Sequence, residues 1–291
     1  MTRLFSKGLR LVVVYILCAG AACAADEGRV VSADTLKVST PLYLPSFQNF
    51  DPPLGKYDFS VRWQGIPAAR LYLTVDREGE NYRIVAEART ISAIELFYLL
   101  RYRGEGLISG LDLSPIRTVI SQRENSRYKY ADMTFNSDGS IHSVYSKKGS
   151  AVKVLDFDPD NFTVDPFSAA FLARSQDWQD GEVRTFDTFN GQSRYLITLN
   201  CIGSETITSD GVSREAWVIS PKVENLTNPA NSKKLRSAKI YLSKDKRRDV
   251  LQIVSKVFIG SVTTRLDSFT PFKRSPRGAA VALSSAAPHG S

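Results

Sequence analysis

Residues 57–64 have the sequence Tyr57-Asp58-Phe59-Ser60-Val61-Arg62-Trp63-Gln64, in which every odd position is apolar and every even position is polar. Successive side chains of a β-strand point to opposite faces of the sheet, so the alternation predicts a strand with one buried and one solvated face. The same period of two continues at Leu71, Leu73 and Val75. A turn at 78–81 then leads into a third alternating segment. The start of the chain's central region is therefore predicted to be an antiparallel β-structure.

Strand-like segments continue to the end of this region. They lie at 82–88, 101–109, 116–124, 127–136, 140–147, 150–156, 183–190, 193–208, 212–220, 236–243, 249–258 and 260–269. Ser137-Asp138-Gly139, Asn190-Gly191 and Ser209-Asp210-Gly211 are typical of hairpin turns, because Gly and Asn adopt positive φ at little cost. We therefore expect an all-β fold, an antiparallel meander that closes into a barrel-like structure or folds into two packed sheets, like a β-spiral.

One segment interrupts the strands. Asp165-Pro166 precedes residues 167–174, and Asp is a good N-cap while Pro suits the first position of a helix. Phe167, Ala170 and Phe171 lie at helical spacing and form one apolar face. The pattern predicts one short helix near 165–174 that plugs an end of the β-structure. A second, weaker helical turn is expected at 94–100.

The N-terminus has the pattern of a secretory signal peptide over residues 1–24. Three basic residues precede the apolar run 11–17, and small residues follow as far as Ala24. We expect cleavage between Ala24 and Ala25, a periplasmic location, and no integral membrane span in the mature chain, since the run is too short to cross a bilayer. Lipidation of Cys23 is the alternative, weakened because Gly20 stands where a lipobox has a larger aliphatic residue.

Composition divides the rest of the chain. Residues 25–53 have no sustained period and are expected to be an irregular lead-in. Residues 54–270 form the predicted β-rich domain, and 271–291, rich in Ser, Ala, Pro and Gly, are expected to be a disordered tail. Three of the net positive charges lie in the signal peptide and three in this tail, which leaves about +2 of the total of +8 for residues 25–272. That balance argues against nucleic acid as a partner.

The sequence is poor in catalytic groups. It has two histidines, His142 and His289, and no nucleophile elbow, metalloprotease helix or phosphate-binding glycine loop. Cys201 shares the parity of apolar neighbours and is expected to be buried and inert. We therefore expect a protein that is not an enzyme and needs no cofactor or metal. The alternative is a hydrolase that uses the acidic loop of Asp156, Asp158 and Asp160.

Aromatic residues are the more promising resource for binding. Trp63, Tyr82, Tyr102, Tyr128 and Trp217 are the candidate ligand-binding residues. Filling of the core is the expected explanation for most of the aromatic residues, but a barrel or curved sheet can leave a cavity or groove for an apolar ligand. The possible partners are thus a lipid or an envelope protein.

Three strings resemble the bacterial domain-of-unknown-function family 3108. They are Trp63-Gln64-Gly65-Ile66-Pro67-Ala68-Ala69, then Asp165-Pro166-Phe167-Ser168-Ala169-Ala170, then Ser243-Lys244-Asp245-Lys246-Arg247-Arg248 with Gly260-Ser261-Val262-Thr263. The family's usual Leu-Pro after the basic turn is here Asp249-Val250. The resemblance implies an exported β-rich envelope protein and brings no established activity or catalytic residues. With the export signal, it predicts a non-catalytic periplasmic protein that supports the cell envelope.

Overall fold

The computed structural model describes residues 32–37, 50–229, 237–256 and 260–272. The predicted signal peptide, with Cys23 and the Ala24–Ala25 cleavage site, lies outside the described residues. So does the predicted tail after Phe272. These features, like the proposed domain boundaries, stay predictions.

The described residues form fifteen strands, two α-helices and one 3-10 helix. The first part of the chain contains η1 (Ala33–Leu36), β1 (Gly55–Trp63), β2 (Ile66–Glu78), β3 (Asn81–Thr90), α2 (Ser92–Glu95), β4 (Leu100–Ile108), β5 (Pro115–Glu124), β6 (Arg127–Phe135), β7 (Ile141–Lys147) and β8 (Lys153–Phe157). The second part contains β9 (Thr163–Val164), α3 (Pro166–Ser175), β10 (Val183–Phe189), β11 (Arg194–Ser209), β12 (Val212–Asn225), β13 (Ser237–Ser243), β14 (Val250–Lys256) and β15 (Ser261–Pro271).

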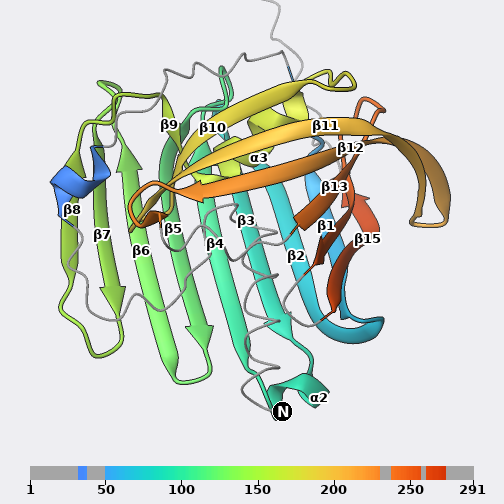
Figure 1. Ribbon diagram of the computed structural model, residues 1–291, viewed down its shortest axis with the longest axis horizontal. Helices are drawn as coiled ribbons and strands as arrows, with labels where there is room; N and C mark the ends of the chain where they lie inside the picture. The colour runs from blue at the N-terminus through green and yellow to red at the C-terminus, as the bar shows by residue number, and fades with distance from the viewer. Residues whose placement is uncertain (1–31, 38–49, 230–236, 257–259, 273–291) are drawn as a thin grey trace, which may run out of the picture.

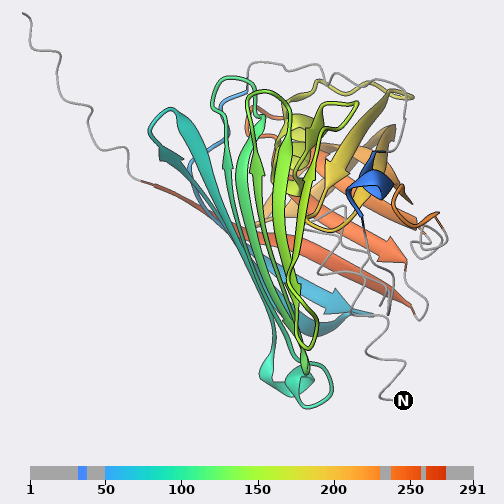
Figure 2. The same cartoon turned by 90° about the vertical axis from the view of Figure 1, so that its left-hand side faces the viewer.

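All fifteen strands belong to one sheet with the order β8-β7-β6-β5-β4-β3-β2-β1-β15-β14-β13-β12-β11-β10-β9. Neighbours pair antiparallel, except that the short β9 runs parallel to β10. Strands β1 to β8 lie side by side in one layer, and β10 to β15 pass across it as a second layer (Figure 1). Figure 2 shows the two layers from the side. The predicted all-β antiparallel class is confirmed.

The sheet does not close, and it is neither a complete barrel nor two separate sheets. It is one open sheet that bends back over itself, with β8 and β9 as its two edges. β9 has only two residues, so it offers β8 too little backbone for a ladder. Side chains fill the space at this end instead, where the rings of Phe157 and Phe189 lie 5.1 Å apart edge to face. Leu36, Met133, Ile141 and Leu155 belong to the same smaller cluster.

The main core lies between the two layers and includes residues of both. Tyr57, Leu71 and Ile84 from the first layer share one buried cluster with Ile197 and Val218 from the second. Because side chains alternate between faces, each strand buries every second residue and leaves the others on the outer face, as the burial pattern of β3 shows. The predicted period of two therefore decides which residues meet in the interior.

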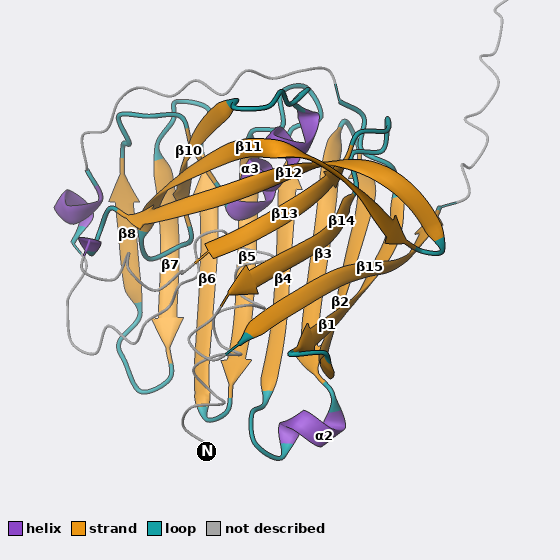
Figure 3. Ribbon diagram, turned by 45° about the vertical axis from the view of Figure 1, so that its right-hand side comes forward, coloured by secondary structure: helices purple, strands orange, loops and turns teal. Residues whose placement is uncertain are grey.

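The predicted helix is present as α3, which lies between the layers (Figure 3). Asp165 caps it, accepting a hydrogen bond from the Ser168 amide at 2.6 Å. Phe167 packs so closely on β4 that a Cβ at Gly106 would lie 2.6 Å from its ring, and one at Gly104 would lie 2.9 Å away. Two glycines in one strand thus mark the place where the helix approaches the sheet. None of the helices among the described residues is long and apolar enough to cross a bilayer.

Part of the expected lead-in is ordered. η1 buries Leu36 completely and lies beside β8 (Figure 1). The fully buried Arg194 on β11 donates to the Leu36 carbonyl and pairs with the equally buried Asp187 on β10. A buried charge pair is tolerated only when its partners are present, so this contact links the N-terminal segment to the second layer.

Other differences from the sequence-based expectations are local. The second helical turn begins earlier than predicted, as α2, and residue 100 already starts β4. Gln64 and Gly65 form the tight turn between β1 and β2, both with positive φ. Pro67 then lies where the β1–β2 register shifts, which fits a residue that has no N–H to give to a ladder.

Candidate functional site

Three of the five predicted ligand-binding residues are part of the core. Tyr82, Tyr102 and Trp217 are 1%, 4% and 8% exposed and belong to the same buried cluster. Tyr82 donates its hydroxyl to an Asp51 carboxylate oxygen at 2.7 Å. These contacts account for the three residues by packing, and a role in ligand binding stays a prediction.

The other two predicted residues lie elsewhere. Trp63 is half-buried at the end of β1 and packs against the main core. Tyr128 is 41% exposed on β6. Along the paired strands β3 and β4, Tyr82 is opposite Ile108 while Tyr102 is opposite Ala88, so these two tyrosines lie far apart along the strands. The structure does not gather the five residues into one site.

The acidic loop offered as the alternative is spread over the surface. Asp156, Asp158 and Asp160 are all exposed. Asp156 contacts Nδ1 of His142 at 2.6 Å on the solvated side of β7 and β8. Among the described residues, no group of three or more His, Cys, Asp or Glu side chains could hold a metal ion. Cys201 is buried as expected, and desolvation raises the pKa of its thiol.

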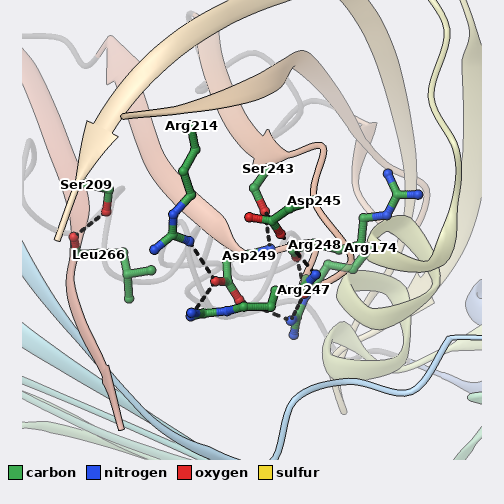
Figure 4. A network of polar contacts seen from close by, with 9 residues as sticks. All are labelled: Arg174, Ser209, Arg214, Ser243, Asp245, Arg247, Arg248, Asp249 and Leu266. Carbon is green, nitrogen blue, oxygen red and sulfur yellow. Dashed lines mark hydrogen bonds and ion pairs between the residues drawn. The ribbon is translucent and has the colours of Figure 1, made fainter. Parts of the chain in front are cut away.

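The basic turn between β13 and β14 holds a buried charge network (Figure 4). Its centre is Asp249, whose side chain is fully buried. Arg214 from β12 and Arg247 from the turn lie 3.0 and 2.6 Å from one carboxylate oxygen of Asp249. Arg174 from α3 lies 3.8 Å from the other. Three guanidinium groups thus converge on one carboxylate.

This network ties α3 to the second layer. Arg174 donates to the carbonyl oxygens of Arg248 and Arg247 at 2.8 and 3.2 Å. Its guanidinium also lies 4.9 Å from the ring centre of Phe171. Because Arg174 is nearly buried and occupied by these contacts, we assign the network a structural role. Arg247 and Arg248 of the basic turn are accordingly half-buried.

A different set of arginines lies on the outer face of the first layer. We call Arg70, Arg89, Arg101 and Arg123 the arginine row. Arg70 is directly opposite Arg89, Arg89 is opposite Arg101, and Arg101 is opposite Arg123, so the row crosses β2, β3, β4 and β5. Like charges directly opposite each other destabilise a sheet. The row is thus an arrangement that folding alone does not favour.

Only part of this charge is neutralised. Arg70 pairs with Asp58 at 2.5 Å and Asp267 at 2.9 Å, and Arg101 pairs with Glu95 at 2.6 Å. Arg89 and Arg123 are exposed, and neither has a carboxylate within 4.0 Å among the described residues. Arg89 lies 5.9 Å from the ring centre of Tyr72, and Arg123 donates to the Asn125 carbonyl at 3.3 Å.

Three members of the row, Arg89, Arg101 and Arg123, line an open depression of about 460 Å³. Its lining residues are Tyr72, Glu87, Ala88, Arg89, Arg101, Tyr102, Arg103, Ser121 and Arg123. Glu87 is the one acid among them, and it is paired with Arg103 at 2.5 Å. Guanidinium groups donate in a planar fork that fits phosphate and carboxylate, so the surface is suited to an anionic group.

The arginine row was not singled out in the sequence. Arg70, Arg89, Arg101 and Arg123 are the polar members of alternating segments, and each by itself resembles an ordinary solvated side chain. Only the pairing register brings them into one line. The signal that could have been used is the clustering of arginine in 101–103 and 117–127, next to turns that contain little acid.

Comparison with solved structures finds a similar fold. The β-barrel-like protein of domain of unknown function DUF1849 from Brucella abortus aligns with a TM-score of 0.54 and 10% identity, covering 77% of this chain and 99% of that chain. A protein from Bacteroides fragilis proposed to be exported aligns at 0.34 with 9% identity, covering 78% and 100%. One from Parabacteroides distasonis proposed to be a lipoprotein aligns at 0.32 with 8% identity and the same coverage. The last two TM-scores are too low to support an argument.

The sequence itself points to a family. No curated protein is significantly similar to the chain. The family model described as protein of unknown function DUF3108 matches residues 58–267, which include the strings quoted from β1–β2, from α3 and from β13 to β15. The match runs from β1 to β15, the first and last strands in chain order. The chain therefore belongs to the DUF3108 family.

Proposed function

We propose that this protein is exported to the periplasm and supports the cell envelope by binding, without catalysis, a partner that carries negative charge. The arginine row is the proposed contact surface. Export is supported by the signal-peptide pattern of residues 1–24. Whether the chain is lipidated at Cys23 does not alter the binding proposal.

The observation that carries this proposal is the arrangement of four arginines across four neighbouring strands. A sheet gains stability from opposite charges at facing positions and loses it from like charges. The two members without a carboxylate partner, Arg89 and Arg123, leave positive charge that an anionic partner would neutralise.

The alternatives receive less support. A hydrolase built on Asp156, Asp158 and Asp160 would require these carboxylates to converge, and they lie exposed along one strand and the following loop. A lipid held in the interior would have to displace aromatic side chains such as Tyr102 from the core. An external charged surface requires neither change.

The test is complementation of an envelope defect in a strain that lacks the gene. The wild-type protein and the triple variant Asp156→Asn, Asp158→Asn, Asp160→Asn should both restore resistance to detergent. The double variant Arg89→Gln, Arg123→Gln should accumulate to the same level in the periplasm and fail to restore it.

A matched control comes from the same strands. Arg83 on β3 and Arg117 on β5 face the same side six residues away, and both flank Leu107 of β4. The variant Arg83→Gln, Arg117→Gln removes the same charge about 20 Å from the row and should complement. If Arg89→Gln, Arg123→Gln complements fully, the row is not the binding surface. If the triple Asn variant fails while folded, the hydrolase is favoured.

A further inference from the structure

An apolar tip projects from the sheet next to the arginine row. Leu96 is 83% exposed and Phe97 is 56% exposed, although both follow directly on α2 in a well-packed connection. Figures 1 and 2 both place α2 beyond the ends of the strands, at one extreme of the molecule. Large apolar side chains displayed together at a protruding point are typical of an interaction site.

The tip is held firmly from beneath. Ile94 and Tyr98 are buried, and the Tyr98 hydroxyl donates to the buried carboxylate of Glu124. The Leu99 amide donates to the Asn125 side chain at 2.8 Å, and the Asn125 amide donates back to the Leu99 carbonyl at 2.9 Å. The β3–β4 connection is therefore fastened to the β5–β6 turn, and in this anchored connection Leu96 and Phe97 are the exposed apolar residues.

The tip and the row lie at the same end of the strands of the first layer. Arg89 is one residue from the end of β3, Arg101 one residue from the start of β4, and Arg123 one residue from the end of β5. The tip leaves the sheet between Arg89 and Arg101. A surface that receives Leu96 and Phe97 would thus also meet the guanidinium groups of the row.

Charge is distributed unevenly along the strands. The ends of β2 to β8 that lie on the side of α2 and of the β5–β6 and β7–β8 turns are called the basic edge. Besides the row it carries Arg127, Lys147, Lys148 and Lys153. Among the described residues of its connections, the acids are Glu95, which is paired with Arg101, and the buried Glu124.

The opposite ends of the same strands carry acids. The turns and loops there contain Glu78, Glu80, Asp112, Asp138, Asp158 and Asp160. The first layer is therefore polarised from an acidic end to a basic end. Such a charge separation turns a molecule so that its basic end approaches a negative surface.

We propose that the basic edge docks on the surface of an anionic phospholipid bilayer, with Leu96 and Phe97 entering the headgroup region and the arginine row contacting lipid phosphates. This inference rests on the proposed function and names its partner. Apolar side chains that enter the interface, together with cations that attract anionic lipids, are the two features by which proteins lie on membranes.

A flat lipid surface fits the geometry better than a protein ligand. The depression beside the row is open to solvent, whereas a protein anchor residue is usually held in a fully desolvated pocket. The apolar residues project outward instead of lining a groove. Val152, in the β7–β8 turn at the same end of the layer, is also exposed.

The experiment is co-sedimentation of the exported, purified protein with vesicles. Vesicles of equal parts phosphatidylglycerol and phosphatidylcholine should bind it, and phosphatidylcholine vesicles should not. Arg89→Gln, Arg123→Gln should weaken binding about 30-fold, since each cation near an anionic surface contributes about fivefold. The control Arg83→Gln, Arg117→Gln should bind nearly as the wild type does. High salt should abolish the difference in vesicle binding between these two double variants, because it shortens the distance over which charges attract.

The tip has its own matched pair of variants. Leu96→Ser should weaken vesicle binding about tenfold, because it removes apolar area from the interface. Leu111→Ser changes an equally exposed leucine, 83%, in the β4–β5 loop at the opposite end and should leave binding unchanged. Equal loss in both variants would show that the tip does not enter the membrane.

The outcomes separate this inference from the proposed function. If Arg89→Gln, Arg123→Gln fails to complement but wild-type protein ignores anionic vesicles, the row binds an anionic protein and the lipid inference is wrong. If vesicle binding depends on the row while that variant still complements, the docking inference holds and the proposed function fails. Equal binding to both kinds of vesicle overturns the inference directly.

Discussion

Asp165 caps a helix, but its carboxyl group is buried where a negative charge is unfavourable. It caps α3 through the Ser168 amide, and the Thr118 hydroxyl donates to its other oxygen. The carboxyl group is completely buried, and desolvation raises its pKa above the usual 3.8 in spite of these hydrogen bonds. Burial therefore favours the neutral form of this carboxyl group, against the hydrogen bonds that it accepts as a cap.

The expected consequence is a pH-dependent stability. Because the pKa is higher in the folded state, that state binds the proton more tightly, and the free energy of unfolding should fall as the pH rises from about 4 through the folded-state pKa. Asp165→Asn keeps a good cap and should remove this slope, so it should be at least as stable as the wild type at neutral pH. Asp165→Ala should lose about 1 kcal/mol. Urea unfolding across pH tests this, and an unchanged slope in Asp165→Asn would contradict it.

At the scale of elements, α3 joins the two layers through two unlike contacts. On one side Phe167 presses against Gly104 and Gly106 of β4. On the other, Arg174 bonds the β13–β14 turn and approaches Asp249. The helix is thus attached to the first layer by close packing and to the second layer by hydrogen bonds and ion pairs.

Asp249→Asn should be strongly destabilising. The change leaves Arg174, Arg214 and Arg247 around a neutral side chain, and breaking a buried charge network typically costs about 3–5 kcal/mol. Asp177→Asn removes a carboxylate that pairs with Arg248 at the surface, 66% exposed, and should cost less than about 1 kcal/mol. Chemical denaturation of both variants measures the contrast. Equal, small losses would show that the network contributes little to stability.

On the scale of the whole molecule, the two faces of the sheet have different roles: the inner face forms the core, and the outer face carries the charged residues. Its inner faces are occupied by the core and α3, so the outer face of the first layer is free for charges that do not help folding. The arginine row and the basic edge lie there, and the acidic turns lie at the other end.

This separation predicts that the row can be changed without loss of stability. Arg89→Gln, Arg123→Gln removes like charges from facing positions and should raise the melting temperature slightly at low salt, with no gain at high salt. Arg83→Gln, Arg117→Gln breaks the ion pairs with Glu105 and Asp132 and should lower it slightly. Melting curves at two salt concentrations decide the question. A clear loss in the first variant would mean that the row is structural.

The all-β class, most strands and α3 could be predicted because their causes are local. Alternation with a period of two reports on one strand, and Asp165-Pro166 reports on one helix start. β9 could not be predicted, since two residues carry no period. Local patterns were also insufficient to predict the role of the aromatic residues proposed for ligand binding. Parity showed that Tyr82, Tyr102 and Trp217 face inward, but not that the interior around them is packed.

Tertiary structure alone decided how the strands are used. Whether a long meander closes depends on the backbone available at its last edges, and here β9 is too short to pair with β8. Whether four arginines form a row depends on the pairing register of four successive strands, β2 to β5, which no single strand pattern specifies. Local sequence patterns determine the face that a side chain occupies. The residues beside it are determined by pairing and packing over the whole molecule, because those contacts join segments whose local patterns are independent.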